Sequence, residues 1–576
     1  MFDDLRYSIR SFLKTPALAA VLLVTLALGI GANTAIFSVV NAVLLRPAPV
    51  HDIERLSMVW ETDRNTGTTR EPASLPDYLD FTRRSRTFES LAAMATGEVN
   101  VTPDTGDPVR LPMLQMTADA LPMLGIRPLV GRTFTREEDR AGGPAVVVIS
   151  ESLWRRAFGG RASIVGETIR LDDRPNVIVG VMPSGADFGV LQILSAAAYS
   201  RGFADRGIKT DVDVWAPLQG DVEQLPRSTH PIFVFGRLAA NATHSDAQGE
   251  MAAIAADLER AYPENAARGV HVEPLESVVF GPVRPSLFIL LAAVALVLLV
   301  ACVNVVNLLL ARASTRVQEA AVRCALGATQ WRLVRQMLAE TLLLTLTAAA
   351  GGIGVAYLGV RSLVAIAPPG VPRLSLARID VPVLAATLGI ALVVGVVVGL
   401  IPIFQGRRMN LQSSLSGAST RTSAGPARTR LRSALVVAEL AFAVLLVCGA
   451  ALLIRSFLDL QRVDPGFQAQ GVLKAEYQLP ASRYPVDFRR WPDFKEQHAF
   501  NAALLQRAAA LPGVTSAAIA GNHPLDPGFT NSFTIAGREA ESRTWPEISI
   551  RRVTPSYFST VGLRCSHSAA FSFWHG

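Results

Sequence analysis

The sequence predicts an α-helical integral membrane protein that carries α+β extracytoplasmic domains. Three observations lead to this fold class. Half of the 576 residues are hydrophobic and the mean hydropathy is +0.31, which is more apolar than an average soluble domain. Five apolar runs are long enough to cross a hydrocarbon core as helices, which takes about 20 residues. The stretch 46–284 between the first two runs is far too long to be a structureless loop.

The five apolar runs are the expected transmembrane segments. Four contain no charged residue, and the fifth contains only Glu439. A buried core helix explains one such run, but five of them favour membrane spans. The first run is too long for the apolar core of a secretory signal, so we expect an uncleaved anchor. The runs cover residues 16–45, 285–311, 341–360, 381–405 and 433–454.

Arginine and lysine predict which segments face the cytoplasm, because basic residues resist translocation. They gather in segments 1–15, 312–340 and 406–432, and the last of these has no acidic residue. We therefore place all three in the cytoplasm. In 1–15 we expect an interfacial helix, with a simple extension of the first span as an equal alternative. In 406–432 we expect a basic linker.

The remaining segments then lie outside: the domain 46–284, the short loop 361–380 and a second domain, 455–576. The arginines of the short loop, Arg361 and Arg373 among them, count against this topology but are outweighed. The net charge of +7 is interpreted as membrane sidedness, so no nucleic-acid partner is expected.

The 46–284 region is predicted to fold as an α+β domain. Residues 145–150 form a strand-like run, 167–182 suggest a hairpin, and 247–262 have helical spacing. The region has no cysteine, so it must fold on packing alone, without a disulfide.

The second outside region contains a weak repeat of the first. A strand, a Thr-containing turn, a helix-like pair and a glycine occur in 111–131 and again in 547–564. After Gly562 the second copy lacks the continuation of the first. We therefore expect the second domain to be incomplete, as in a truncated or frame-shifted product.

The charged segment 312–340 predicts two cytoplasmic helices hinged at a glycine. The first places basic and acidic groups on one face, and the second begins near Thr329 and leads into the third span. The alternative is a solvated basic loop, which needs charges but neither helical faces nor a hinge. The residues expected to contact a partner are Arg316, Glu319, Arg323, Gly327, Trp331, Arg332 and Arg335.

Small and polar residues inside the spans predict helix packing. Gly395 and Gly399 form a G-x-x-x-G pair, which lets two helix backbones approach closely. For Asn304 and Asn307 we favour interhelical hydrogen bonds over a substrate pathway.

The string QEAAVRCALGATQWRLVRQMLAETLLL (318–344) resembles the cytoplasmic coupling segment of FtsX/MacB-like permeases of ABC transporters. Residues 5–45 and GETIRLDDRPNVIVGVMP (166–183) resemble the first span and the MacB-like periplasmic core of the same family. The layout is similar to the duplicated orphan permease subfamily, here C-terminally truncated. This resemblance implies a multi-pass protein of the bacterial cell inner membrane with a cytoplasmic N-terminus.

The resemblance also implies a function. The chain would be a permease subunit that couples ATP hydrolysis by a separate ABC ATPase to movement of the extracytoplasmic domain, for export or release of a substrate. The alternative is a non-transporting mechanotransmission protein that regulates an extracytoplasmic partner such as a cell-wall hydrolase. Membrane lipids, a periplasmic adaptor, an outer-membrane channel and a second copy of the chain complete the expected partners.

The sequence contains no enzyme signature. A P-loop needs a Gly-Lys pair, and none of the four lysines follows a glycine. ATPase activity is therefore expected only in the partner subunit. The eight histidines show no metal-site spacing, and no G-x-S-x-G elbow occurs, so we expect no catalytic, cofactor or metal site.

Overall fold

The structure is a computed structural model of the chain. The residues it describes are 10, 12–13, 15–46, 50–101, 109–186, 188–199, 212–223, 225–315, 330–366, 371–406, 426–468, 470–480, 482–484, 494–522, 524–525, 529–531, 533, 535–538 and 548–563. The chain forms two compact units. Residues 1–46 and 282–463 make up the first, which we call the helical unit, and residues 47–281 and 464–576 make up the second, the sheet unit. Most of the expected interfacial helix at 1–15 lies outside the described residues.

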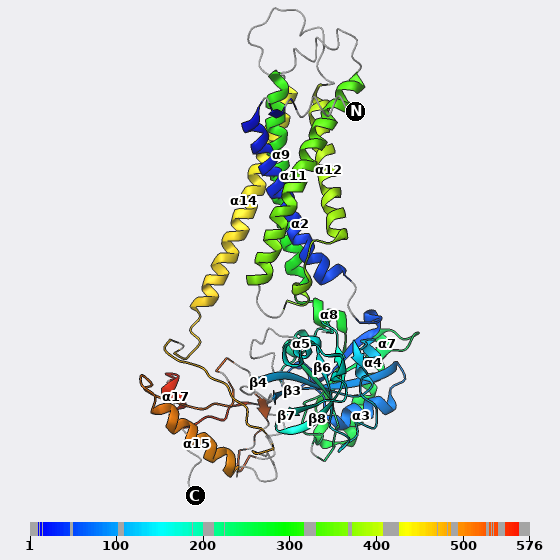
Figure 1. The fold of residues 1–576 in the computed structure, drawn as a ribbon, viewed down its shortest axis with the longest axis vertical. Coiled ribbons are helices and arrows are strands. Elements are labelled where there is room, and N and C mark those ends of the chain that lie inside the picture. Colours follow the sequence, from blue (N-terminus) through cyan, green and yellow to red (C-terminus); the bar gives the residue numbers. More distant parts are fainter. Residues whose placement is uncertain are drawn as a thin grey trace, which may run out of the picture. The chain divides into compact units, whose positions relative to one another are not determined.

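Five helices dominate the helical unit, and among the described residues each is long and apolar enough to cross a membrane (Figure 1). The first begins with Pro16, whose missing N–H costs nothing at a helix start, and ends in a π-helical turn, η1 (Asn41–Leu45). The short 3-10 turn η6 (Leu374–Leu376) precedes the fourth. The five helices are α2 (Pro16–Val40), α9 (Arg284–Thr315), α11 (Gln330–Ile366), α12 (Val381–Gly406) and α14 (Pro426–Arg462).

Four of these helices share one apolar core. Leu22, Leu26 and Ile30 of α2 are fully buried in it, among aliphatic side chains of α9, α11 and α12. In α14, no residue of the window that could span a membrane is buried, although some are partly covered. An apolar helix surface of this kind is stable in a bilayer, where lipid tails cover it.

One mixed sheet organises the sheet unit. Its main path runs β11-β1-β10-β3-β4-β9-β6-β8-β5, with β2 beside β1 and β7 beside β3 and β8. The pairs β4–β9 and β6–β8 are parallel, and the other pairs are antiparallel. The strands are β1 (Leu56–Asp63), β2 (Thr68–Glu71), β3 (Phe88–Val101), β4 (Val109–Met116), β5 (Val130–Gly131), β6 (Val146–Ser150), β7 (Thr168–Leu171), β8 (Arg174–Met182), β9 (Val214–Pro217), β10 (Phe233–Leu238) and β11 (Arg268–Pro274).

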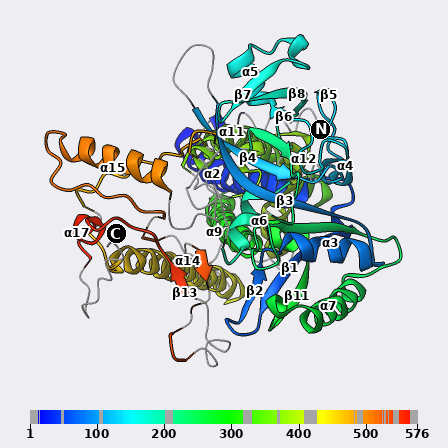
Figure 2. The ribbon, with the colours of Figure 1, turned by 90° about the horizontal axis from the view of Figure 1, so that it is seen from below.

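Helices cover this sheet. Tyr78 and Phe81 of α3 pack with Met251 and Leu258 of α7 over one end of the sheet, and Figure 2 shows α7 beside β11. Leu153 of α5 packs on a second core at β6 and β8. The helices and 3-10 turns are η2 (Ile53–Arg55), α3 (Leu75–Arg84), α4 (Ala120–Leu124), α5 (Glu151–Phe158), η3 (Ala162–Ile164), α6 (Val190–Ala196), α7 (His244–Ala261), η5 (Pro263–Asn265) and α8 (Leu275–Phe280).

Local patterns in this domain are confirmed. The hairpin expected at 167–182 is the antiparallel pair β7–β8. Its turn is tighter than expected, because Asp172 and Asp173 both adopt left-handed backbone angles, with φ of 47° and 65°. The helix expected at 247–262 is α7, which begins earlier because Thr243 and Asp246 form a capping box.

The two segments that resembled each other in sequence also share a structure. Thr117 donates its N–H to Ala93 O, and its hydroxyl accepts the Ala93 N–H. Thr554 makes the same two hydrogen bonds with Ile519. Each Thr is followed by a short helix, α4 or α17 (Tyr557–Thr560), and then by a left-handed glycine. The same unit contains α15 (Lys495–Ala509), β12 (Phe529–Asn531) and β13 (Ile548–Ile550).

Candidate functional site

Four of the predicted coupling residues precede the start of α11 in the sequence, and three lie within its first turns. Arg316, Glu319, Arg323 and Gly327 lie outside the described residues. Trp331, Arg332 and Arg335 belong to α11, and Arg335 is exposed. This helix has 37 residues, so it extends for about 55 Å as one rod. Its charged start and the third apolar run are therefore parts of a single rigid element.

Glycines bring α11 against α2. A Cβ added to Gly31 of α2 would lie only 2.8 Å from Gly352 O of α11, and one on Gly352 would lie 3.0 Å from Ala27 O. Real Cβ atoms essentially never approach a backbone oxygen as closely as 2.8 Å, so a side chain at Gly31 would push the two helices apart, and one at Gly352 would be tight. The two helices therefore approach each other closely here, with no long side chain between their backbones.

The glycine pair of α12 also packs against α11. A Cβ on Gly395 would lie 2.6 Å from Thr345 Oγ1, and one on Gly399 would lie 2.5 Å from Thr341 Oγ1. Both threonines are buried and donate their hydroxyls to carbonyls of their own helix. The two hydroxyl groups are therefore hydrogen-bonded within α11, and the glycines of α12 leave space for the threonine side chains.

Hydrogen bonds also cross between helices. Asn33 Nδ2 of α2 donates to Val294 O of α9 over 2.7 Å, and Thr34 and Thr387 share a hydrogen bond of 3.0 Å between α2 and α12. Asn304 and Asn307 lie half-buried on α9. Within the described part of the chain, Asn307 Oδ1 is buried without a hydrogen-bond partner.

A polar cluster closes the end of the bundle at which α2 stops. Arg46 Nη2 donates to Asp380 Oδ2 over 2.8 Å. Asp380 also accepts from the backbone N–H of Val383 and so caps α12, while Arg373 Nη1 donates to the carbonyl oxygen of Arg46 over 2.8 Å. The last residue of the helical unit before the sheet unit is thereby held on two sides.

Sequence reasoning missed this cluster. From the sequence alone, Arg373 counts only as a charge that opposes the predicted topology, and Asp380 is not singled out. The sequence does contain a pattern that could have indicated the cluster: Asp380 is a single acidic residue at the start of an expected helix, where it can act as an N-cap, and arginines lie nearby in the sequence.

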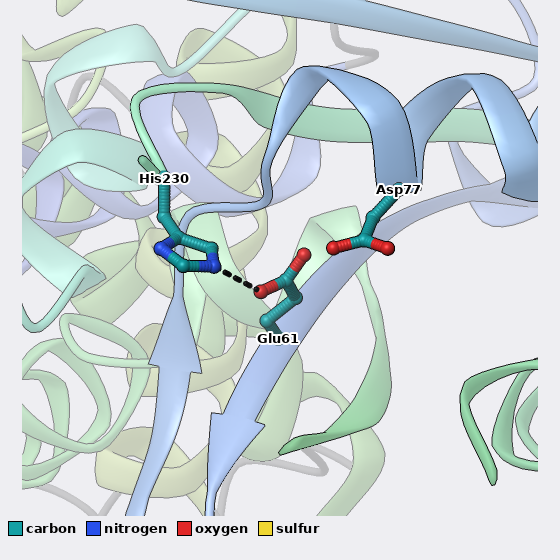
Figure 3. Close-up of side chains that lie close together, drawn as sticks. All are labelled: Glu61, Asp77 and His230. Carbon is teal, nitrogen blue, oxygen red and sulfur yellow. Dashed lines mark ion pairs between the residues drawn. The ribbon is translucent and has the colours of Figure 1, made fainter. Parts of the chain in front are cut away.

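The sheet unit holds a second polar group that the sequence did not indicate. Figure 3 shows the Glu61 carboxylate between the His230 ring and the Asp77 carboxylate. Burial, and then the negative charge of Asp77, raise the pKa of Glu61 well above its ordinary value. Burial, and then the positive Arg268, lower the pKa of His230 to about 3. His230 is therefore neutral near pH 7.

Two protein families match the chain. The MacB-like periplasmic core domain matches residues 19–254, and the FtsX-like permease C-terminal domain matches residues 291–411. Together they cover more than half of the chain.

Individual relatives are distant. The pyoverdine export ATP-binding/permease protein PvdT of Pseudomonas savastanoi is 24% identical over 294 residues, which are 50% of this chain and 40% of that protein. The uncharacterized ABC transporter permease YknZ of Bacillus subtilis is 25% identical over 47% of this chain and 61% of its own length. The chain thus spans less than two thirds of the length of these relatives.

Solved structures of similar regions are also known. The periplasmic region of MacB from Actinobacillus actinomycetemcomitans covers 41% of this chain and 95% of its own, with 10% identity and a TM-score of 0.29.

Proposed function

Since the chain belongs to the FtsX/MacB-like family of ABC transporter permeases, we propose that it transmits the work of a separate ABC ATPase to an extracytoplasmic domain, for export or release of a substrate. In this proposal the residues 316–335 face the cytoplasm and receive the ATPase. The P-loop is absent from these 576 residues, so nucleotide hydrolysis is assigned to another subunit.

One observation supports this mechanism above the others: α11 is continuous from Gln330 to Ile366. A force on the charged N-terminal end of α11 displaces the whole helix, because the hydrogen bonds between its turns resist compression along the helix axis. The backbone contact of Gly31 with Gly352 transfers this displacement to α2. The chain then passes directly from Arg46 into the sheet unit.

The route is mechanical rather than a pore. Polar side chains in the bundle are few, and those of Asn33, Thr34 and Thr387 are occupied by hydrogen bonds between or within helices. An open aqueous path needs polar groups that face water. We therefore propose that the substrate is handled at the extracytoplasmic side. The relative PvdT is named as a pyoverdine export protein, which favours export over regulation of a wall hydrolase.

Affinity purification of the chain from native membranes, followed by mass spectrometry, tests the partner. We expect an ABC ATPase to co-purify, and Arg323→Glu combined with Arg332→Glu to abolish its recovery. Arg361→Glu is the matched control, since Arg361 is exposed on the same helix but at the opposite end. Equal recovery of the ATPase with both forms would refute the coupling role.

A further inference from the structure

We propose that Glu61, Asp77 and His230 bind a divalent transition-metal ion of the Zn²⁺ type, which joins three separate segments of the sheet unit. Glu61 belongs to β1, Asp77 to α3, and His230 to the segment before β10. One ligand atom of each lies within 4.8 Å of the others, and Figure 3 shows the three side chains converging. The proposal does not depend on the transport function.

The distance between two of the atoms suits a shared ion. Glu61 Oε2 lies 3.3 Å from His230 Nε2. Two ligands on a tetrahedral Zn²⁺, each bound at about 2.0–2.1 Å, lie about 3.3–3.4 Å apart. A charge-assisted hydrogen bond would be shorter, about 2.7–2.9 Å. Among the described residues, neither atom has a hydrogen-bond partner.

The lone pairs of Glu61 Oε2 and His230 Nε2 are buried and lack a hydrogen-bond donor among the described residues. The Asp77 carboxylate accepts hydrogen bonds from Arg227, Asn265 and Ser74, and a bound ion would use a remaining lone pair of this group. The side chains of Glu61, Asp77 and His230 are only 3%, 1% and 8% exposed. Buried polar atoms are nearly always paired, with protein, water or an ion. Asn265 Oδ1 is another buried oxygen without a partner in the described structure, and it borders a cavity of about 10 Å³ beside Glu61 and Asp77. That space holds about one water, which suits the remaining ligand position of an ion.

The local charge favours a divalent cation. Arg227 bridges Asp77 and Asp80, and Arg268 pairs with Glu71. Each guanidinium balances the charge of one carboxylate. With every carboxylate ionised, as metal binding requires, the described groups of this region carry two negative charges in excess. Four carboxylates thus face two guanidinium groups: Glu61, Glu71, Asp77, Asp80, Arg227 and Arg268. One doubly charged ion would balance them.

The donor atoms select the kind of metal. Ca²⁺ and Mg²⁺ prefer oxygen ligands alone, whereas one imidazole nitrogen with two carboxylates suits Zn²⁺ and its neighbours. Region 46–284 has no cysteine, so no disulfide can tie β1 to α3. An ion at this position would supply that cross-link and stabilise the fold.

Zinc titration of the full-length chain in detergent, after removal of metals with a chelator, tests the site. All four cysteines are replaced by serine, because thiolates also bind zinc. We expect one tightly bound Zn²⁺ per chain, and binding weakened by at least about tenfold in His230→Ala and Glu61→Gln. His498→Ala, at an exposed position of α15, is the matched control and should bind as the parent does.

Equal zinc binding by the parent and His230→Ala would overturn the proposal, as would the absence of a bound ion in the parent. Circular dichroism shows whether each variant folds. Co²⁺ in place of Zn²⁺ gives a readout that needs no variant: visible absorption bands are expected on addition of one equivalent, and their absence would overturn the site.

Discussion

Arg46 Nη2 lies 2.8 Å from Asp380 Oδ2 and joins the end of α2 to the residue that caps α12. The two side chains are 25% and 17% exposed, so water screens the pair only in part. Because the carbonyl of Arg46 also accepts from Arg373, one residue at the exit of the helical unit is held by two others. In the proposed mechanism, this contact passes movement of the helices to the chain that follows Arg46.

The first prediction concerns this pair. Arg46→Ala and Asp380→Asn should each lower the free energy of unfolding. The double variant should lose about 1 kcal/mol less than the sum of the two single variants, because either substitution alone already removes the partly buried ion pair and its hydrogen bond. Thermal unfolding in detergent measures this coupling. The exposed pair Arg455–Asp459 on α14 is the control and should show no coupling. Additive losses at Arg46 and Asp380 would contradict the linkage.

Much of this molecule follows from periodicity and composition. Apolar runs predict spans because a bilayer leaves the backbone no alternative to helix, and the structure has long apolar helices at α2, α9, α11, α12 and α14. The β7–β8 hairpin and α7 follow from local turn and capping chemistry. These features depend on neighbouring residues, which a sequence displays directly.

Long-range groups were not predictable in the same way. Glu61 and His230 meet only because β1 and β10 are neighbours in the sheet, although the two residues lie far apart in the chain. Arg46 and Asp380 likewise meet across the helical unit. Nothing in local spacing encodes such contacts, so a search for metal-ligand motifs could not find the first pair.

The second prediction tests close packing of α11 and α12. Gly399→Leu should destabilise the bundle by about 1–3 kcal/mol, because the new side chain overlaps Thr341, which lies 2.5 Å from the added Cβ. Gly389→Leu on the same helix is the matched control, since no atom lies within 4 Å of a Cβ there. Thermal unfolding in detergent compares the two variants. Helix propensity alone favours leucine over glycine at both positions, so a similar loss in both variants would contradict the packing explanation.

The third prediction concerns pH and Glu250 of α7. Burial opposes ionisation, but hydrogen bonds from Thr87, Ser85 and the backbone of Arg86 outweigh it and lower the pKa of Glu250 to about 2. The folded-state pKa lies below the ordinary 4.5, so this group stabilises the fold above about pH 4.5. That contribution disappears as the pH falls towards 2.

Glu250→Gln should therefore cost about 1–2 kcal/mol at pH 7, a figure reduced for the partial exposure of the side chain, and progressively less below pH 4.5. Urea unfolding between pH 7 and pH 3 measures the difference from the parent. Glu223→Gln, at an exposed position, should change little at any pH. A loss in Glu250→Gln that stays constant with pH would contradict the ionic contribution.

The fourth prediction concerns sidedness. Cys324 belongs to the segment that we place in the cytoplasm, and Cys302 and Cys448 lie within apolar helices. With Cys565 replaced by serine, a membrane-impermeant maleimide should not label Cys324 in spheroplasts but should label it in inverted membrane vesicles. Cys324→Ser is the control for background labelling. Rapid labelling in sealed spheroplasts would place this segment on the other side of the membrane.

The central claim is that α11 carries displacement from its charged start to its far end. Spin labels at Leu358 of α11 and Leu453 of α14, both exposed positions, report this movement in a cysteine-free chain reconstituted with its co-purified ATPase. Pulsed electron paramagnetic resonance should show a distance distribution that shifts when the ATPase is trapped with ATP and vanadate. An unchanged distribution, with the ATPase bound and trapped, would contradict the claim.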